Sequence, residues 1–172
     1  TYRHEENTGG PFRARVEGFK LAKGEWITTM DCDDFVEPKY IQNLLDTTEN
    51  GKYDIAVTGH KRYWEDGKIE KFYWDDYNQT TNDRLSTFYQ HLLNNDFWTD
   101  PTDTLGQNLF RSDIVKNINY DNISNNIWAE DTYLALSIIA NSKNGINFHD
   151  FHDFNWLQRE GSGSHGGFSQ SS

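Results

Sequence analysis

Three carboxylates lie within four residues of this chain, at Asp31, Asp33 and Asp34. Because like charges at this spacing repel one another, a compensating cation is expected. Carboxylate oxygens are hard ligands that suit Mg²⁺, Mn²⁺ or Ca²⁺. An EF-hand is excluded, since the glycine at its sixth position and the glutamate at its twelfth are both absent. The sequence therefore predicts a divalent-metal site on Asp31 and Asp33, whereas Asp34 is better explained as the cap of a helix that begins near Glu37.

A second acidic pair, Glu130 and Asp131, precedes a run of apolar residues with helical spacing. This run predicts a helix that has both carboxylates in its first turn. The positive end of the helix dipole favours carboxylates at that place, so the dipole alone is a sufficient explanation for the pair. A catalytic role requires support from another part of the chain.

The composition excludes several classes of protein. The 172 residues suffice for one domain with its own core. Sixteen basic residues stand against 27 acidic ones, and the net charge of −11 argues against nucleic acid as the main ligand. No apolar run has the length that a bilayer crossing needs. The single cysteine, Cys32, excludes an internal disulfide and is typical of a reducing compartment, so a cytoplasmic location is expected.

The first part of the chain alternates helices with strands. Apolar residues at helical spacing predict a helix over residues 12–22. Residues 25–30 carry the β-branched and aromatic side chains that strands favour, and this strand runs into the acidic cluster. A second helix begins near Pro38 and ends before Gly51, and residues 53–59 are apolar enough for a strand inside a sheet. The short connections imply parallel strands and an α/β layer.

The remainder of the chain predicts a hairpin, three helices and three short strands. The hairpin turns at Asp66-Gly67, the helices cover residues 83–93, 111–117 and a stretch from about residue 130, and the strands cover residues 106–110, 146–148 and 154–157. No linker of the kind found at domain boundaries interrupts these elements. Residues 1–160 are therefore interpreted as one domain, and the Gly- and Ser-rich residues 161–172 as a flexible tail.

Three segments resemble the inverting glycosyltransferases of family 2, which have the GT-A fold, a Rossmann-like mixed α/β sheet flanked by helices. Residues 9–27 resemble the family's run from Gly-Gly through Ala-Arg-Asn to Gly-Glu-Tyr-Ile, although Val16 replaces the usual Asn. Residues 31–34 resemble its Asp-x-Asp-Asp element, and residues 130–131 resemble its Glu-Asp pair at a helix start. A fainter similarity covers the Arg-x-x-Ser segment in residues 158–162. Each motif is short, but the three in this order are specific together.

The resemblance also implies that part of the domain is missing. Family members begin with two strands that end in Pro-x-Tyr-Asn and Asp-Asp-Gly-Ser stretches and hold the base and ribose of the donor. Neither stretch occurs here, so the chain is interpreted as an N-terminally truncated GT-A domain. A sheet without its leading strands exposes an edge, and self-association or a partner chain is expected to cover it.

By this resemblance, the reaction is sugar transfer from a nucleotide-diphosphate donor. The leaving diphosphate needs a Mn²⁺ or Mg²⁺ ion, for which Asp33 is the expected direct ligand. Asp31 is expected to complete the metal shell or to contact the donor ribose. The acceptor hydroxyl must lose a proton, and Asp131 is the expected catalytic base.

Further residues are assigned to the two substrates. Arg15, Arg159 and His165 are expected to bind the donor, although a solvated helix face explains Arg15 nearly as well. Glu130 and Trp128 are expected to contact the acceptor.

The expected function is metal-dependent transfer, with inversion, from a UDP-sugar to a glycan or lipid-linked acceptor, as in bacterial cell-surface polysaccharide synthesis. With this function, the protein is expected to lie at the periphery of the inner face of the membrane. Two alternatives stay open. The aromatic content of 15% also suits a non-enzymatic carbohydrate-binding or assembly module, and the acidic cluster alone suits a metal-dependent phosphohydrolase. The His- and Asp-rich residues 149–153 are interpreted as surface or loop, because alternate residues of a strand point to opposite faces.

Overall fold

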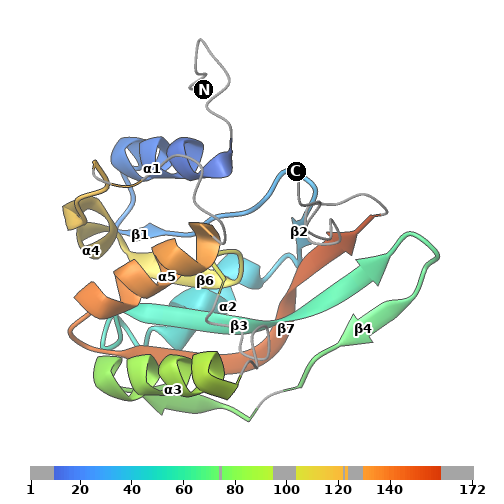
Figure 1. Cartoon of the computed structure of the whole chain (residues 1–172). Helices are drawn as coiled ribbons and strands as arrows, with labels where there is room; N and C mark the ends of the chain where they lie inside the picture. The colour runs from blue at the N-terminus through green and yellow to red at the C-terminus, as the bar shows by residue number, and fades with distance from the viewer. Residues whose placement is uncertain (1–9, 74, 95–103, 122, 124–129, 160–172) are drawn as a thin grey trace.

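The chain forms a mixed sheet with helices on both faces (Figure 1). The computed structural model describes residues 10–73, 75–94, 104–121, 123 and 130–159. Within these residues the sheet order is β1 (Trp26–Ile27), β6 (Asn108–Arg111), β3 (Ile55–Trp64), β7 (Ile146–Gln158) and β2 (Phe35–Val36). Two further strands pair at the sides, β4 (Ile69–Lys71) with β3 and β5 (Tyr77–Gln79) with β7.

The long strands β3 and β7 are the axis of this sheet. They run parallel from the pair Ile55 and Ile146 to the pair Trp64 and Gln158, while the other pairings in the described residues are antiparallel. The register shifts beside Gly59. A Cβ atom at Gly59 would lie 2.0 Å from the Asp150 side chain, so any larger residue there would displace the Asp150 carboxylate. The irregularity divides the sheet into a first half, covered by helices, and a second half that ends in the β3–β4 hairpin.

Three of the expected strands differ from those observed. The strand expected over residues 25–30 is wrong in its extent, since β1 ends at Ile27 and pairs only with β6 in the described residues. The strands expected over residues 146–148 and 154–157 are parts of one strand, β7, because both pair with β3. Residues 149–153 therefore lie within β7, at its register shift, which corrects the loop part of their interpretation as surface or loop. The hairpin at Asp66-Gly67 is confirmed.

The five predicted helices are confirmed. They are α1 (Pro11–Leu21), α2 (Tyr40–Thr47), α3 (Thr81–Asn94), α4 (Ser112–Asn117) and α5 (Glu130–Asn141). None of the helices in the described part of the chain combines the length and the apolarity that a membrane crossing requires.

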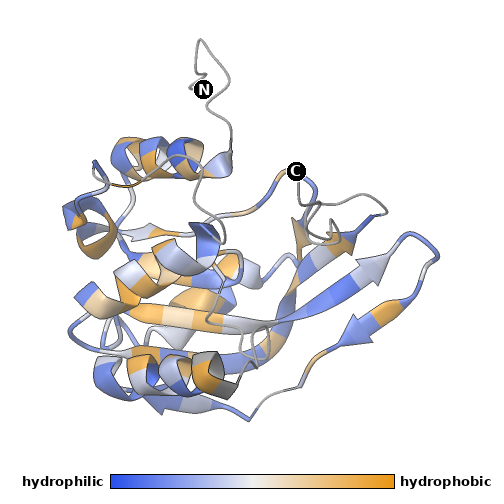
Figure 2. Cartoon of the chain, in the orientation of Figure 1, coloured by the Kyte–Doolittle hydropathy of each residue, from blue (hydrophilic) through white to orange (hydrophobic). Residues whose placement is uncertain are grey.

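Buried side chains on both faces of the sheet hold the helices in place. Ile55 and Val57 of β3 pack in a core with α1, α4 and α5, whereas Ala56 faces Tyr40 and Leu44 of α2. This is the period of two that strands impose. Figure 2 shows a second difference, along the length of β3. Its start, inside the layer, is hydrophobic, and its end, toward the hairpin, is hydrophilic.

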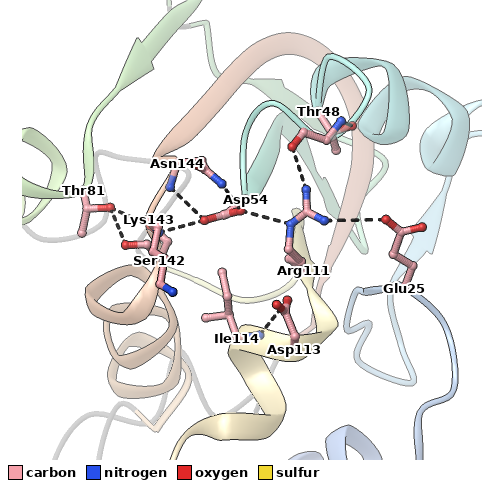
Figure 3. A network of polar contacts seen from close by, with 11 residues as sticks. Glu25, Thr48, Asp54, Thr81, Arg111, Asp113, Ile114, Ser142, Lys143 and Asn144 are labelled. Carbon is pink, nitrogen blue, oxygen red and sulfur yellow. Dashed lines mark hydrogen bonds and ion pairs between the residues drawn. The ribbon is translucent and has the colours of Figure 1, made fainter.

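A buried polar network fixes the start of β3 and the end of α5 (Figure 3). The Asp54 carboxylate accepts hydrogen bonds from the backbone N–H groups of Lys143 and Asn144, both at 2.8 Å, and from Arg111 Nε at 3.1 Å. Burial would raise the pKa of Asp54, but these hydrogen bonds hold it below its usual value. Arg111 also donates to the Gly51 carbonyl at 2.7 Å. Because α5 is anchored here by its carboxyl end, its first turn is directed to the opposite end of the layer.

Candidate active site

One arginine joins the acidic segments that lie far apart in the sequence. Arg15 Nη2 donates to Asp31 Oδ1 at 2.7 Å, and Arg15 Nη1 donates to Glu130 Oε1 at 2.5 Å. Arg15 is positioned by α1, whose buried residues Phe12 and Val16 flank it in the sequence. The structure thus brings the acidic loop and the first turn of α5 into one site.

The surroundings of Arg15 keep its charge. Only 15% of its side chain is exposed, and burial by itself lowers the pKa of a guanidinium. The hydrogen bond to Asp31 and the charges of Asp31, Glu130 and Asp131 outweigh burial, so the pKa of Arg15 lies above its usual value. The guanidinium therefore holds two carboxylates in fixed positions through its fork of donors.

Replacing Arg15 by Gln is expected to lower kcat about 100-fold, the loss typical when a reacting group is displaced by about 1 Å. Arg15→Lys should restore little, because one ammonium cannot reproduce the fork that spans two carboxylates. Arg13→Gln is the matched control, since Arg13 lies exposed on the same helix. Equal kcat values for Arg15→Gln and Arg13→Gln would contradict the assignment of Arg15 to the site.

The acidic loop itself is attached to the end of β7. The Asp34 N–H donates to the Asp31 carbonyl at 3.1 Å and closes a turn. Arg159 pairs with Asp33, and Asp34 Oδ1 accepts the Leu157 N–H at 3.2 Å. The interpretation of Asp34 as a helix cap is therefore wrong. Burial, together with the charges of Asp31 and Asp33, raises the pKa of Asp34 to about 6.

The described residues contain no group of three His, Cys, Asp or Glu side chains that converge on a metal position. Asp31 and Asp33 point to different arginines. The His- and Asp-rich part of β7 is similarly divided, because His149 pairs with Asp76 at 2.8 Å and not with its neighbours. A metal at Asp33 and Asp31 would therefore need further ligands from a substrate.

Asp131 lies beside this cluster in the first turn of α5. Its Oδ1 accepts the Thr132 N–H at 2.8 Å. Burial raises the pKa of Asp131 above its usual value, the neighbouring Glu130 adds to the rise, and the Thr132 hydrogen bond and Arg15 oppose it. A partly buried carboxylate with a raised pKa is suited to accept a proton.

The other expected site residues have different outcomes. Arg159 lies at Asp33, whereas Trp128 and His165 are outside the described residues. The bridge that Arg15 makes between two carboxylates was not predicted from the sequence. The place of Arg15 between the buried positions of an amphipathic helix could have indicated that it lies at the edge of the core. The role of Leu157 had no such signal, since the hydrogen bond comes from its backbone.

The sheet and its flanking helices have the GT-A fold of glycosyltransferases. The structure of S. aureus TarS residues 1–349 in complex with UDP-GlcNAc matches 97% of this chain with a TM-score of 0.69 and 18% sequence identity. The same TarS segment in complex with UDP matches 90% of the chain with a TM-score of 0.64 and 17% identity. This chain covers 44% and 42% of those two chains.

The family follows from the sequence comparison. The profile of the family described as Glycosyl transferase family 2 matches residues 1–118, and the chain belongs to this family. The glycosyltransferase GlyG of Streptococcus pneumoniae is 34% identical over 70 residues, which are 41% of this chain and 23% of GlyG. The predicted family and fold are confirmed, and the chain spans less than half of each of these relatives.

Proposed function

We propose that the protein containing this chain is an inverting glycosyltransferase that moves a sugar from a UDP-sugar to a glycan or lipid-linked acceptor, as in bacterial cell-surface polysaccharide synthesis. The observation that carries the proposal is the Arg15 bridge, which unites Asp31 with the Glu130-Asp131 pair. The TarS complexes with UDP and UDP-GlcNAc support a nucleotide-sugar donor. A cytoplasmic location at the inner face of the membrane, and a partner chain or second copy along the sheet edge, belong to the same proposal.

In the proposed reaction, Asp131 accepts the proton of the acceptor hydroxyl. As this proton leaves, the hydroxyl oxygen forms a bond to the anomeric carbon of the donor sugar. The bond between that carbon and the diphosphate oxygen breaks on the opposite side, so the configuration inverts. Glu130, held by Arg15, orients the acceptor hydroxyl toward Asp131.

A Mn²⁺ or Mg²⁺ ion that is shared with the donor belongs to the proposal, with the acidic loop as its place. Mg²⁺ in phosphate sites is usually held by one or two carboxylates together with substrate phosphates, so Asp33 and Asp31 suffice as protein ligands. When bound, the ion would neutralise charge on the leaving diphosphate. Arg159, which pairs with Asp33, would then be released to hold a donor phosphate.

Asp33→Ala is expected to weaken Mn²⁺-dependent UDP binding at least about tenfold, which corresponds to about 1.4 kcal/mol. Calorimetry on the whole protein, with and without Mn²⁺, measures this loss. Asp46→Ala is the matched control, because it removes the same charge from the exposed side of α2. Unchanged UDP binding by Asp33→Ala would contradict its assignment as a metal ligand.

Three measurements on the whole protein distinguish the alternative functions. Release of UDP from a UDP-sugar in the presence of Mn²⁺ is the result expected for a transferase. Glycan binding without metal, together with no nucleotide binding, would favour the carbohydrate-binding module. Phosphate release from simple esters would favour the phosphohydrolase.

A further inference from the structure

An aromatic shelf lies directly beside the acidic loop. We define it as Phe35, Glu37, Lys61 and Tyr63, and Phe35 follows Asp34 in the sequence. The rings of Phe35 and Tyr63 meet edge to face with their centroids 5.0 Å apart. Phe35 comes from β2 and Tyr63 from β3, so the rings meet across the end of β7, beside which β2 lies in Figure 1.

The shelf combines this ring pair with charged hydrogen-bonding groups. Lys61 Nζ donates to Glu37 Oε1 at 2.5 Å and lies 5.9 Å from the centre of the Tyr63 ring. Lys61 and Tyr63 are two residues apart in β3 and therefore share one face of the sheet. Beneath them, Asn155 is fully buried, and its Oδ1 atom accepts no hydrogen bond within the described residues.

The shelf is open to a ligand. Phe35 keeps 43% of its surface exposed, and the Glu37 side chain keeps 40%. An aromatic ring that served only the core would be expected to be buried, as Phe154 on the neighbouring strand is. An exposed ring beside a hydrogen-bonded charged pair, of which Lys61 keeps 13% and Glu37 40% of its side chain exposed, is instead typical of a specific ligand site.

The contacts of the shelf connect it with the catalytic cluster. Leu157 lies beside Tyr63 in the sheet, and its N–H donates to Asp34. Two residues further along the chain, Arg159 pairs with Asp33. A ligand on the shelf therefore lies next to the carboxylates assigned to the donor.

We infer that the shelf binds a sugar ring of the acceptor glycan, with the Phe35 and Tyr63 rings against the apolar face of the sugar and the Glu37–Lys61 pair on its hydroxyl groups. This inference rests on the proposed function, because it places the acceptor beside the same site. A saccharide matches the shelf in chemistry, since a sugar ring presents C–H groups on one face and hydroxyls at its edge.

The test compares Phe35→Ala, Phe35→Leu and Tyr63→Ala with Tyr73→Ala in the whole protein. Tyr73 is the control because it is an exposed aromatic residue, at 74%, outside the shelf. Phe35→Leu keeps an apolar side chain of similar size, so a loss shared by both Phe35 variants cannot be attributed to unfolding. Two measurements are made, binding to a printed glycan array and UDP release from a UDP-sugar with Mn²⁺ in the absence of acceptor.

Shelf variants are expected to lose about tenfold or more in glycan affinity, the effect of about one ring contact, while UDP release stays within about twofold of the unsubstituted protein. Equal glycan binding by the Phe35 and Tyr73 variants would overturn the inference, as would an array without signal for an unsubstituted protein that releases UDP. An unsubstituted protein that neither binds UDP nor releases it would contradict the proposed function instead. In that case, a glycan signal lost only by the shelf variants would still establish the shelf as a sugar site.

Discussion

Replacement of Asp131 by Asn is expected to lower the rate of sugar transfer by about 100- to 10,000-fold, the range for removal of a general base. Asn keeps the size of the side chain and can still accept the Thr132 N–H, so the fold of α5 is preserved. It cannot accept the proton of the acceptor hydroxyl. The fall should therefore appear in kcat, measured as UDP release with acceptor present, with UDP binding unchanged.

Asp113→Asn is the matched control for this experiment. Asp113 lies in the first turn of α4 and accepts the N–H of the next residue at 3.0 Å, as Asp131 does in α5. It is exposed and lies outside the cluster joined by Arg15. Undiminished transfer by Asp131→Asn would exclude Asp131 as the base.

The pH dependence provides an independent check. Since burial raises the pKa of Asp131, the deprotonated base is lost at a higher pH than an ordinary aspartate would be. Activity should fall as the pH is lowered through that raised pKa. Arg15→Gln removes a positive charge that opposes the rise, so it should move the acid limb to still higher pH.

Asp54→Asn is expected to lower the free energy of unfolding by about 3 kcal/mol, at the lower end of the range for breaking a buried ion pair. The loss of stability is at the lower end because Arg111 keeps its hydrogen bond to the Gly51 carbonyl. In the unsubstituted protein, the Asp54 carboxylate accepts hydrogen bonds from the N–H groups of Lys143 and Asn144. The side-chain amide introduced by the substitution would place its own hydrogens against these donors. For a chain of this length the loss corresponds to a fall in Tm of about 6–12 °C in a thermal melt.

Glu17→Gln is the control for stability, because its partner Lys20 is half exposed and such surface pairs contribute about 0–1 kcal/mol. The pKa of Asp54 is lowered in the fold, so its contribution is present above the pKa of the unfolded chain and is lost as the pH falls through the folded value. The difference in stability between the unsubstituted protein and the Asp54→Asn variant should therefore shrink in acid. A constant difference at every pH would assign the effect to packing.

The helices could be predicted from the sequence because their signals are local. The apolar stripe of α1 and the acidic first turn of α5 each depend on residues within one or two turns. The strands were less predictable, since pairing partners decide where a strand ends. β7 continues through polar residues because β3 pairs with it on both sides of the bulge, and β1 stops at Ile27 despite a favourable composition.

The members of the site could be predicted better than their contacts. Asp31 and Asp131 were identified by motif, yet no local pattern shows that one guanidinium spans the 115 residues from Arg15 to Glu130. The Asp54 network was missed for the same reason. Its partners lie at positions 111 and 143–144, and only the fold brings them together.

The single positive charge of Arg15 between two carboxylates leaves the cluster with an excess of negative charge, in a protein whose net charge is −11. The diphosphate of the proposed donor would therefore approach a surface of its own sign, and the repulsion would decrease as salt screens it. A divalent cation at Asp33 would offset most of this negative charge. Cation and donor would then each increase the affinity of the site for the other by the same factor, as thermodynamic linkage requires.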